Sequence, residues 1–130
     1  MKFGYTIAYV KDVPATLAFF ERAFGLTIRF VHESGYGELA TGETTLAFAT
    51  HELGRKNLPN GYVAADGSPL PLGIEIALVT EDVTAAHAKA LSQGAKEIAS
   101  PVKKPWGQTV SYVQSPDGIL IELCTPVMDS

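Results

Sequence analysis

Several features that would assign a function directly are scarce or missing in this chain of 130 residues. Its single cysteine, Cys124, excludes an internal disulfide and fits a reducing cytoplasm, where we expect the protein to reside. The net charge of -4 comes without any clustered run of lysine and arginine, which argues against a nucleic-acid partner. No apolar run is long enough to span a bilayer and the first residues lack the core of a signal peptide, so no membrane partner is expected.

Common catalytic motifs are missing as well. The sequence has no glycine-rich phosphate loop after a strand, no paired cysteines with metal-ligand spacing and no Gly-x-Ser-x-Gly elbow. Cys124 has no basic neighbour in the sequence that would activate its thiol. These absences argue against a nucleophilic hydrolase.

The chain contains an internal sequence repeat, whose two copies lie about seventy residues apart. Residues 5–13 match residues 75–83, and each copy continues into an alanine-rich amphipathic segment that stops at a glycine, Gly25 or Gly94. Each copy reads as strand, helix and three further strands, which predicts an α+β protein of two tandem βαβββ modules. We expect one domain, 1–130, divided into module one at about 1–50, a linker or lid at about 51–72 and module two at about 73–127.

The element boundaries follow from alternation, caps and turn residues. The predicted helices begin after Asp12, with Pro14 in the first turn, and after Asp82. The predicted strands are 3–10, 26–32, 36–40, 44–50, 73–80, 96–99, 108–114 and 119–124. Residues 115–118, Ser-Pro-Asp-Gly, predict a tight turn, whereas the linker shows no clean periodicity.

With these modules the sequence resembles the vicinal oxygen chelate superfamily, which contains glyoxalase I, bleomycin resistance proteins and extradiol dioxygenases. The resemblance covers nearly the whole chain and rests on the paired module order, on residues 105–108 (Pro-Trp-Gly-Gln) and on residues 115–123. It implies that each module curls into half of an open mixed β-barrel with its helix outside. It also implies that the concave faces hold a metal or a ligand and that the protein is a homodimer.

In metal-dependent relatives the ligands come from the opening and final strands of each module. The resemblance places Tyr5 and Glu75 at the opening-strand positions, and Ala47 and Glu122 at the final-strand positions. Only Glu122 matches, and histidine is missing where the family would supply it, although a catalytic divalent site normally needs three ligands with histidine prominent. No cofactor is therefore expected, and a divalent metal held by Glu75, Glu122 and His51 is the alternative.

Each candidate residue also has an ordinary interpretation. Glu122, inside an apolar strand, is either a ligand-contacting group or a structural carboxylate bonded to Tyr5 or water, and Glu75 is equally ambiguous. His51 is a replacement ligand, a general base or an exposed strand end. Trp106 on its loop either stacks on a planar ligand, closes an interface or plugs the end of the barrel.

The leading hypothesis is a glyoxalase/bleomycin-resistance-like protein that binds a small organic molecule between its modules without a catalytic metal, as in antibiotic resistance. One alternative is a metal-dependent glyoxalase-like lyase or isomerase that uses Glu75 and Glu122, and another is a metal-free enzyme with a glutamate general base. Tyr62 is a candidate lid residue. The expected ligand-binding residues are Tyr5, Phe48, Glu75, Trp106, Tyr112 and Glu122.

Overall fold

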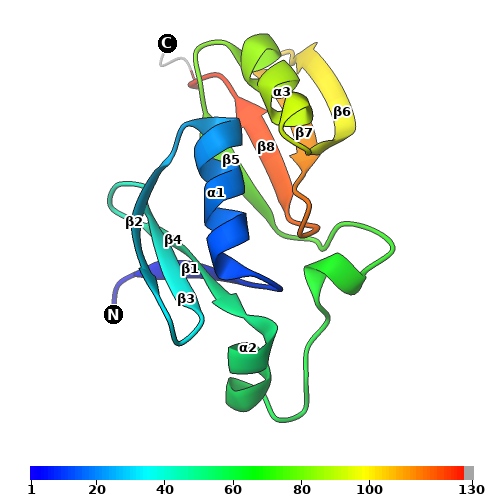
Figure 1. The fold of residues 1–130 in the computed structure, drawn as a ribbon. Coiled ribbons are helices and arrows are strands. Elements are labelled where there is room, and N and C mark those ends of the chain that lie inside the picture. The colour runs from blue at the N-terminus through cyan, green and yellow to red at the C-terminus, as the bar shows by residue number, and fades with distance from the viewer. Residues whose placement is uncertain (128–130) are drawn as a thin grey trace. The chain divides into compact units, whose positions relative to one another are not determined.

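The computed structural model describes residues 1–127, which form two compact units, Met1–Gly67 and the residues from Ser68 on. Each unit contains one four-stranded sheet with a helix against one of its faces (Figure 1). No helix in the described part of the chain is long and apolar enough to cross a membrane. The predicted domain range, 1–130, includes residues 128–130, which lie outside the described residues.

The first unit has the predicted strand, helix and three strands, followed by two short helices. Its sheet has the order β1-β4-β3-β2, in which β1 and β4 are parallel and the other neighbours are antiparallel. The elements are β1 (Tyr5–Val10), α1 (Val13–Phe24), β2 (Thr27–His32), β3 (Tyr36–Ala40), β4 (Thr45–Thr50), α2 (His51–Asn57) and the 3-10 helix η1 (Ala65–Gly67).

The second unit repeats this arrangement in the order β5-β8-β7-β6, again with one parallel and two antiparallel pairs. Neither sheet is closed, and the predicted α+β fold of two βαβββ modules with open mixed sheets is confirmed. The elements are β5 (Glu75–Val79), α3 (Val83–Ser92), β6 (Lys96–Lys103), β7 (Thr109–Gln114) and β8 (Leu120–Cys124).

Local sequence explains where α1 begins and ends. The Asp12 carboxylate accepts a hydrogen bond from the Ala15 N–H at 3.1 Å, and proline in the first turn loses no helical hydrogen bond. Gly25 takes the left-handed conformation, with φ of 69°, and its N–H closes the helix on the Glu21 carbonyl. The cap, the first-turn proline and the glycine stop were all predicted correctly.

The core of the first unit lies between α1 and one face of the sheet. Phe20 on α1 and Phe48 on β4 are both fully buried, with ring centroids 5.0 Å apart. A Cβ at Gly37 on β3 would lie 2.6 Å from Leu17 Cδ1, so glycine allows the helix to approach the strand closely. The expectation that Phe48 contacts a ligand is therefore wrong, because its side chain belongs to this core.

The segment after β4 is more ordered than the sequence predicted. Thr50 caps α2 by accepting from the Leu53 N–H at 3.2 Å, and Tyr62 packs on Tyr9 with ring centroids 4.8 Å apart. The interpretation of 51–72 as a connection without structure is wrong for α2 and η1. A helix of two turns is too short to show a clear hydrophobic period.

The predicted end of the second strand of module two also needs correction. β6 continues to Lys103 and not only to Ala99, although Pro101 interrupts its ladder. The sheet order makes β6 an edge strand, where a residue without an N–H is tolerated. The proline therefore marks an irregular edge and not the end of the strand.

Candidate functional site

The sheet of the second unit has one face covered by α3 and one face free of helices. Ile121 and Leu123 of β8 are buried on the α3 side, so Glu122 between them lies on the opposite face. In the ladder Glu122 is paired with Ala77 on β5 and with Tyr112 on β7, which share that face. We name this surface the acidic face and define it by Glu75, Tyr112, Glu122 and Cys124.

Tyr112 is the hydrogen-bond partner of Glu122. Its phenol donates to Glu122 Oε1 at 2.8 Å, so the carboxylate finds its partner on the neighbouring strand and not at Tyr5, the residue that the sequence suggested. The hydrogen bond to Glu122, together with burial and the charges of Glu122 and Glu75, raises the pKa of Tyr112 to about 12. Tyr112 therefore stays a neutral donor that orients the carboxylate.

Glu75 lies beside Glu122 on the same face. Burial raises the pKa of Glu75, and the negative charge of Glu122 and a hydrogen bond between the two carboxyl groups raise it further. Glu75 therefore gives up its proton less readily than an isolated glutamate does. The predicted pair of glutamates is thus brought together by β5 and β8.

This pair predicts a pH-dependent gain in stability for Glu75→Gln. Since folding raises the pKa of Glu75 above 4.5, the charged form destabilises the fold, with no penalty below about pH 4.5 and the full penalty above the raised pKa. The free energy of unfolding of the variant, measured in urea, should exceed that of the wild type increasingly as pH rises through this window. The effect should be modest because the Glu75 side chain, although partly desolvated on the sheet face, remains exposed and its charge is screened by solvent.

The exposed Glu81, which follows β5, offers the matched control for this measurement. Glu81→Gln removes the same charge away from the carboxyl pair and should give a difference that does not depend on pH. A Glu75→Gln difference that is equally independent of pH would contradict the proposed coupling.

Cys124 closes the acidic face but cannot act as a nucleophile. Burial raises the pKa of its thiol to about 11, and the hydrogen bond to Glu122 and the charges of Glu122 and Glu75 contribute. A thiol with this pKa remains protonated at neutral pH, and protonated sulfur neither attacks carbonyls nor binds metals well. The sequence-based prediction that Cys124 is unreactive agrees with this buried, acidic environment.

The first unit has an acid on its own helix-free face, but on a different strand. Ala47 of β4 is paired with Ile7 and Glu38, so it occupies the position that Glu122 has in the second sheet, as predicted. Tyr36 donates to Glu38 Oε2 at 2.7 Å, and Arg29 Nε lies 3.8 Å from Oε1. Burial, together with the hydrogen bond to Glu38 and its charge, raises the pKa of Tyr36 to about 12.

Sequence reasoning missed this Tyr36 and Glu38 pair. The available signal was a charged residue between Gly37 and Leu39 in a strand with little other polarity. Glu38 is only 7% exposed, and such burial requires the two partners that the structure supplies.

Tyr5 and Trp106 are both accessible in their own units. Tyr5 begins β1 on the helix-free face and is 59% exposed. Trp106 is 64% exposed in a turn closed by Lys104, and its indole N–H donates to Gln108 Oε1 at 2.9 Å. Their predicted contacts with a ligand stay predictions.

His51 has partners within the first unit at both ring nitrogens. Its Nδ1 lies 2.7 Å from the Tyr62 hydroxyl, and its Nε2 lies 3.1 Å from Asp66 Oδ2. A metal ion at His51 would have to displace one of these contacts, which makes its imidazole a poor metal ligand.

The donor set of the acidic face does not fit the catalytic metal that the fold family implies. It provides two carboxylates, while the high pKa values of Tyr112 and Cys124 keep the phenol and the thiol protonated. Within either unit, no three His, Cys, Asp or Glu side chains of residues 1–127 gather in a way that could hold an ion. A tight transition-metal site normally needs at least three such donors.

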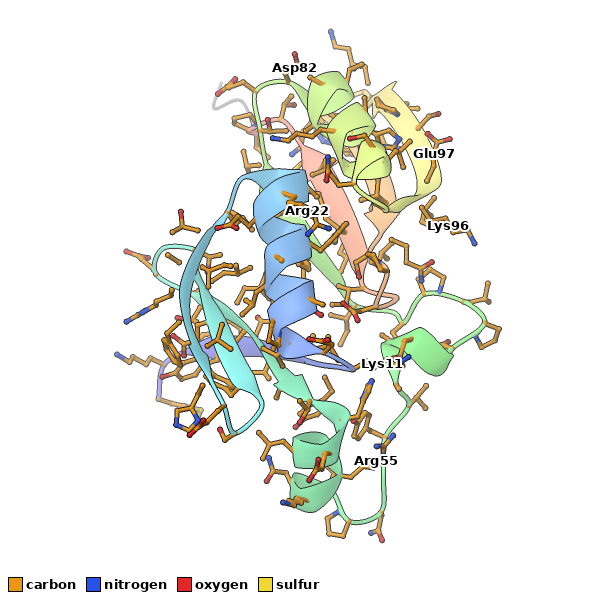
Figure 2. The ribbon with its side chains drawn as sticks, in the orientation of Figure 1. Lys11, Arg22, Arg55, Asp82, Lys96 and Glu97 are labelled. Atoms are coloured by element: carbon orange, nitrogen blue, oxygen red, sulfur yellow. The ribbon has the colours of Figure 1, made fainter. Side chains whose placement is uncertain are left out.

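A further polar chain, which the sequence did not reveal, lies under α3. His87 Nδ1 is 2.9 Å from Ser111 Oγ, and Nε2 is 2.7 Å from Glu97 Oε2 on β6, the strand on which Figure 2 labels Glu97. The order of groups is that of a serine hydrolase triad, but Ser111 is only 1% exposed. No substrate can reach this hydroxyl, so the chain fastens α3 to its sheet.

The comparisons with known proteins agree with one another. The family model described as Glyoxalase/Bleomycin resistance protein/Dioxygenase superfamily matches residues 2–123. The uncharacterized protein YwbC of Bacillus subtilis (strain 168) is 32% identical over 127 residues, covering 93% of this chain and 94% of its own length.

Solved structures show the same fold at low identity. A glyoxalase-related enzyme from Fulvimarina pelagi has a TM-score of 0.81 at 16% identity, covering 97% of this chain and 88% of its own. A glyoxalase/bleomycin resistance protein/dioxygenase family enzyme from Burkholderia phytofirmans PsJN has a TM-score of 0.77 at 19% identity, covering 95% and 97%. TioX from Micromonospora sp. ML1 has a TM-score of 0.70 at 17% identity, covering 96% and 98%.

Proposed function

Because this chain belongs to the glyoxalase/bleomycin resistance protein/dioxygenase superfamily, we propose that it binds a small organic molecule with a basic group at the acidic face. The observation that supports this proposal is the Glu75 and Glu122 pair, which lies on a sheet face without a covering helix. The pair has no cationic partner in its own unit among residues 68–127, since no ion pair to either carboxylate is found there.

A bound cation would relieve the repulsion within this pair. The charge of Glu122 helps to raise the pKa of Glu75, and a bound ammonium or amidinium group would offset this charge. Tyr112 orients Glu122 by donating to one of its oxygens, and a cationic group that replaces the Glu75 proton would donate to the same carboxylate. Apolar surface stands nearby on β5, where Val79 is 66% exposed and can pack against the organic part.

An exposed aromatic residue would provide a further contact with the ligand. Trp106, which belongs to the same unit as the acidic face, offers a flat ring that a planar ligand could stack on. The ligand is expected to bind without a metal, as in drug sequestration of the bleomycin-resistance type, because the donor set does not fit a catalytic ion. The homodimer and the cytoplasmic location inferred from the sequence stay part of this proposal.

A second candidate function follows from the hydrogen bond between the two carboxyl groups. A glutamate whose pKa is raised by burial and by a neighbouring acid is a stronger base than an ordinary carboxylate, which is the property that a metal-free general base uses. Turnover of a bound compound that is lost in Glu75→Gln, while binding persists, would favour this enzyme over the binding protein.

Calorimetric titration with benzylamine tests the binding proposal. Benzylamine carries a cationic head, and benzyl alcohol has nearly the same shape without the charge. We expect benzylamine to bind more tightly, and Glu122→Gln to weaken its binding by about tenfold, because a charge-assisted hydrogen bond is lost.

The same titration of Glu81→Gln, an exposed charge away from the acidic face, should match the wild type. Equal binding of the amine and the alcohol, or an unaffected Glu122→Gln protein, would refute the assignment. One equivalent of a divalent metal that survives dialysis and is lost in Glu122→Gln would show that the metal alternative is correct.

A further inference from the structure

A pocket of about 310 Å³ lies in the segment that follows β4, within the first unit. Its walls come from α2 and from the loop that leads toward η1 (Figure 1). The lining residues are Arg55, Leu58, Pro59, Asn60, Gly61, Tyr62 and Ala64. None of these residues is part of the acidic face, so the pocket is a separate feature.

Backbone hydrogen bonds and ring packing give the pocket a defined shape. The N–H of Leu58 donates to the Gly54 carbonyl, and the N–H of Gly61 donates to the Leu58 carbonyl, each at 2.9 Å. The ring of Tyr62 packs on Tyr9, and a Cβ at Gly54 would lie only 2.9 Å from the Tyr62 hydroxyl. The loop is therefore held closely against α2.

A network of three side chains, Asp66, His51 and Tyr62, holds the Tyr62 side of the pocket in place. His51 Nε2 lies 3.1 Å from Asp66 Oδ2, and His51 Nδ1 lies 2.7 Å from the Tyr62 hydroxyl. His51 itself is the first residue of α2, so this network ties residues 62–66 back to the helix. These contacts, together with the packing of Tyr62 on Tyr9, hold the Tyr62 ring in place.

The charge of the pocket comes from Arg55. Figure 2 labels this residue on α2, and no hydrogen bond or ion pair to its guanidinium is found among residues 1–127. The neighbouring Lys56, by contrast, lies 3.8 Å from Glu52. No acidic residue lines the pocket, and Leu58, Pro59 and Ala64 give it apolar surface.

From this combination we propose that the pocket binds a small organic carboxylate. Arg55 pairs with the carboxylate through its two-pronged guanidinium, and the apolar residues and the Tyr62 ring contact the hydrocarbon part. Tyr62, His51 and Asp66 act as positioning residues that keep the wall in place. The first unit thus has an anion site, distinct from the cation site proposed on the second unit.

Amide chemical shifts recorded during a benzoate titration test this site, with benzamide as the uncharged analogue. We expect benzoate to shift the amides of residues 58–64, and benzamide to shift them much less. Arg55→Ala should weaken benzoate binding by about tenfold, Arg55→Lys should weaken it less, and Lys56→Ala should leave it unchanged. Shifts confined to other residues, equal binding of both compounds or an unaffected Arg55→Ala protein would overturn the proposal.

Tyr62→Phe tests the positioning network separately, because it keeps the ring and removes only the hydroxyl. We expect benzoate affinity to fall a few fold, benzylamine binding to stay unchanged and the His51 ring ¹⁵N shifts to change as Nδ1 loses its hydrogen-bond partner. Unchanged His51 shifts together with unchanged benzoate affinity would refute the positioning role.

Discussion

Phe48→Ala is expected to lower the free energy of unfolding by about 3–5 kcal/mol, the usual cost of removing a buried phenylalanine ring. Phe48 is fully buried against Phe20, and its loss leaves a cavity under α1 that the close contact between Gly37 and Leu17 prevents from collapsing. Urea denaturation followed by circular dichroism measures the change.

A phenylalanine-to-alanine substitution at an exposed position is the control, because it changes the same side chain without removing a buried ring. Phe3 is 71% exposed before β1, and Phe3→Ala should change the free energy of unfolding by less than about 0.5 kcal/mol. A loss at Phe48 below about 1 kcal/mol would mean that its ring is not in the core, and the expected contact with a ligand would regain support.

His87→Ala is expected to cost about 2–4 kcal/mol, which is unusual for a polar residue on a helix. The ring of His87 is 5% exposed, so its loss leaves a cavity and also deprives the Ser111 hydroxyl of its partner. Part of the cost comes from the hydrogen bond to Glu97, which joins α3 to β6. Denaturation of the variant in urea gives the value.

His32→Ala is the matched control for this change. His32 is exposed at the end of β2, and its ring contacts Ser34 in the adjacent turn, so its loss should be nearly neutral. If both variants lost the same stability, the buried chain under α3 would contribute nothing specific. The double variant His87→Ala/Ser111→Ala should recover part of the lost free energy of unfolding, because it also removes the unpaired hydroxyl.

Elements with local signals were predicted closely. α1 has a cap at Asp12 and a stop at Gly25, and the turn at 115–118 is closed by the Gly118 N–H on the Ser115 carbonyl with a positive φ at Gly118. Caps and turns are made by residues a few positions apart, so their chemistry is visible in the sequence. α2 and the extension of β6 were missed because two turns of helix and an edge strand with proline have weak local patterns.

The candidate site was predicted only in part. Glu75 and Glu122 do lie together, as the resemblance implied, but the partner of Glu122 is Tyr112, and Phe48 points to the opposite side of its sheet. Which face a strand residue occupies depends on the register with its neighbours, and a shift of one residue reverses it. The alternation of side chains along a strand assigns residues to two faces of the sheet, but it does not show which face the helix covers.

The amino-acid sequence by itself determined the duplicated βαβββ order, the family and the two acids, because repetition, caps and motif residues are properties of the chain. Tertiary structure alone decided which side chains are partners: Glu38 with Tyr36, His51 between Tyr62 and Asp66, and His87 between Ser111 and Glu97. These contacts depend on how strands, helices and loops pack, and their energies arise only when burial removes water from the polar groups.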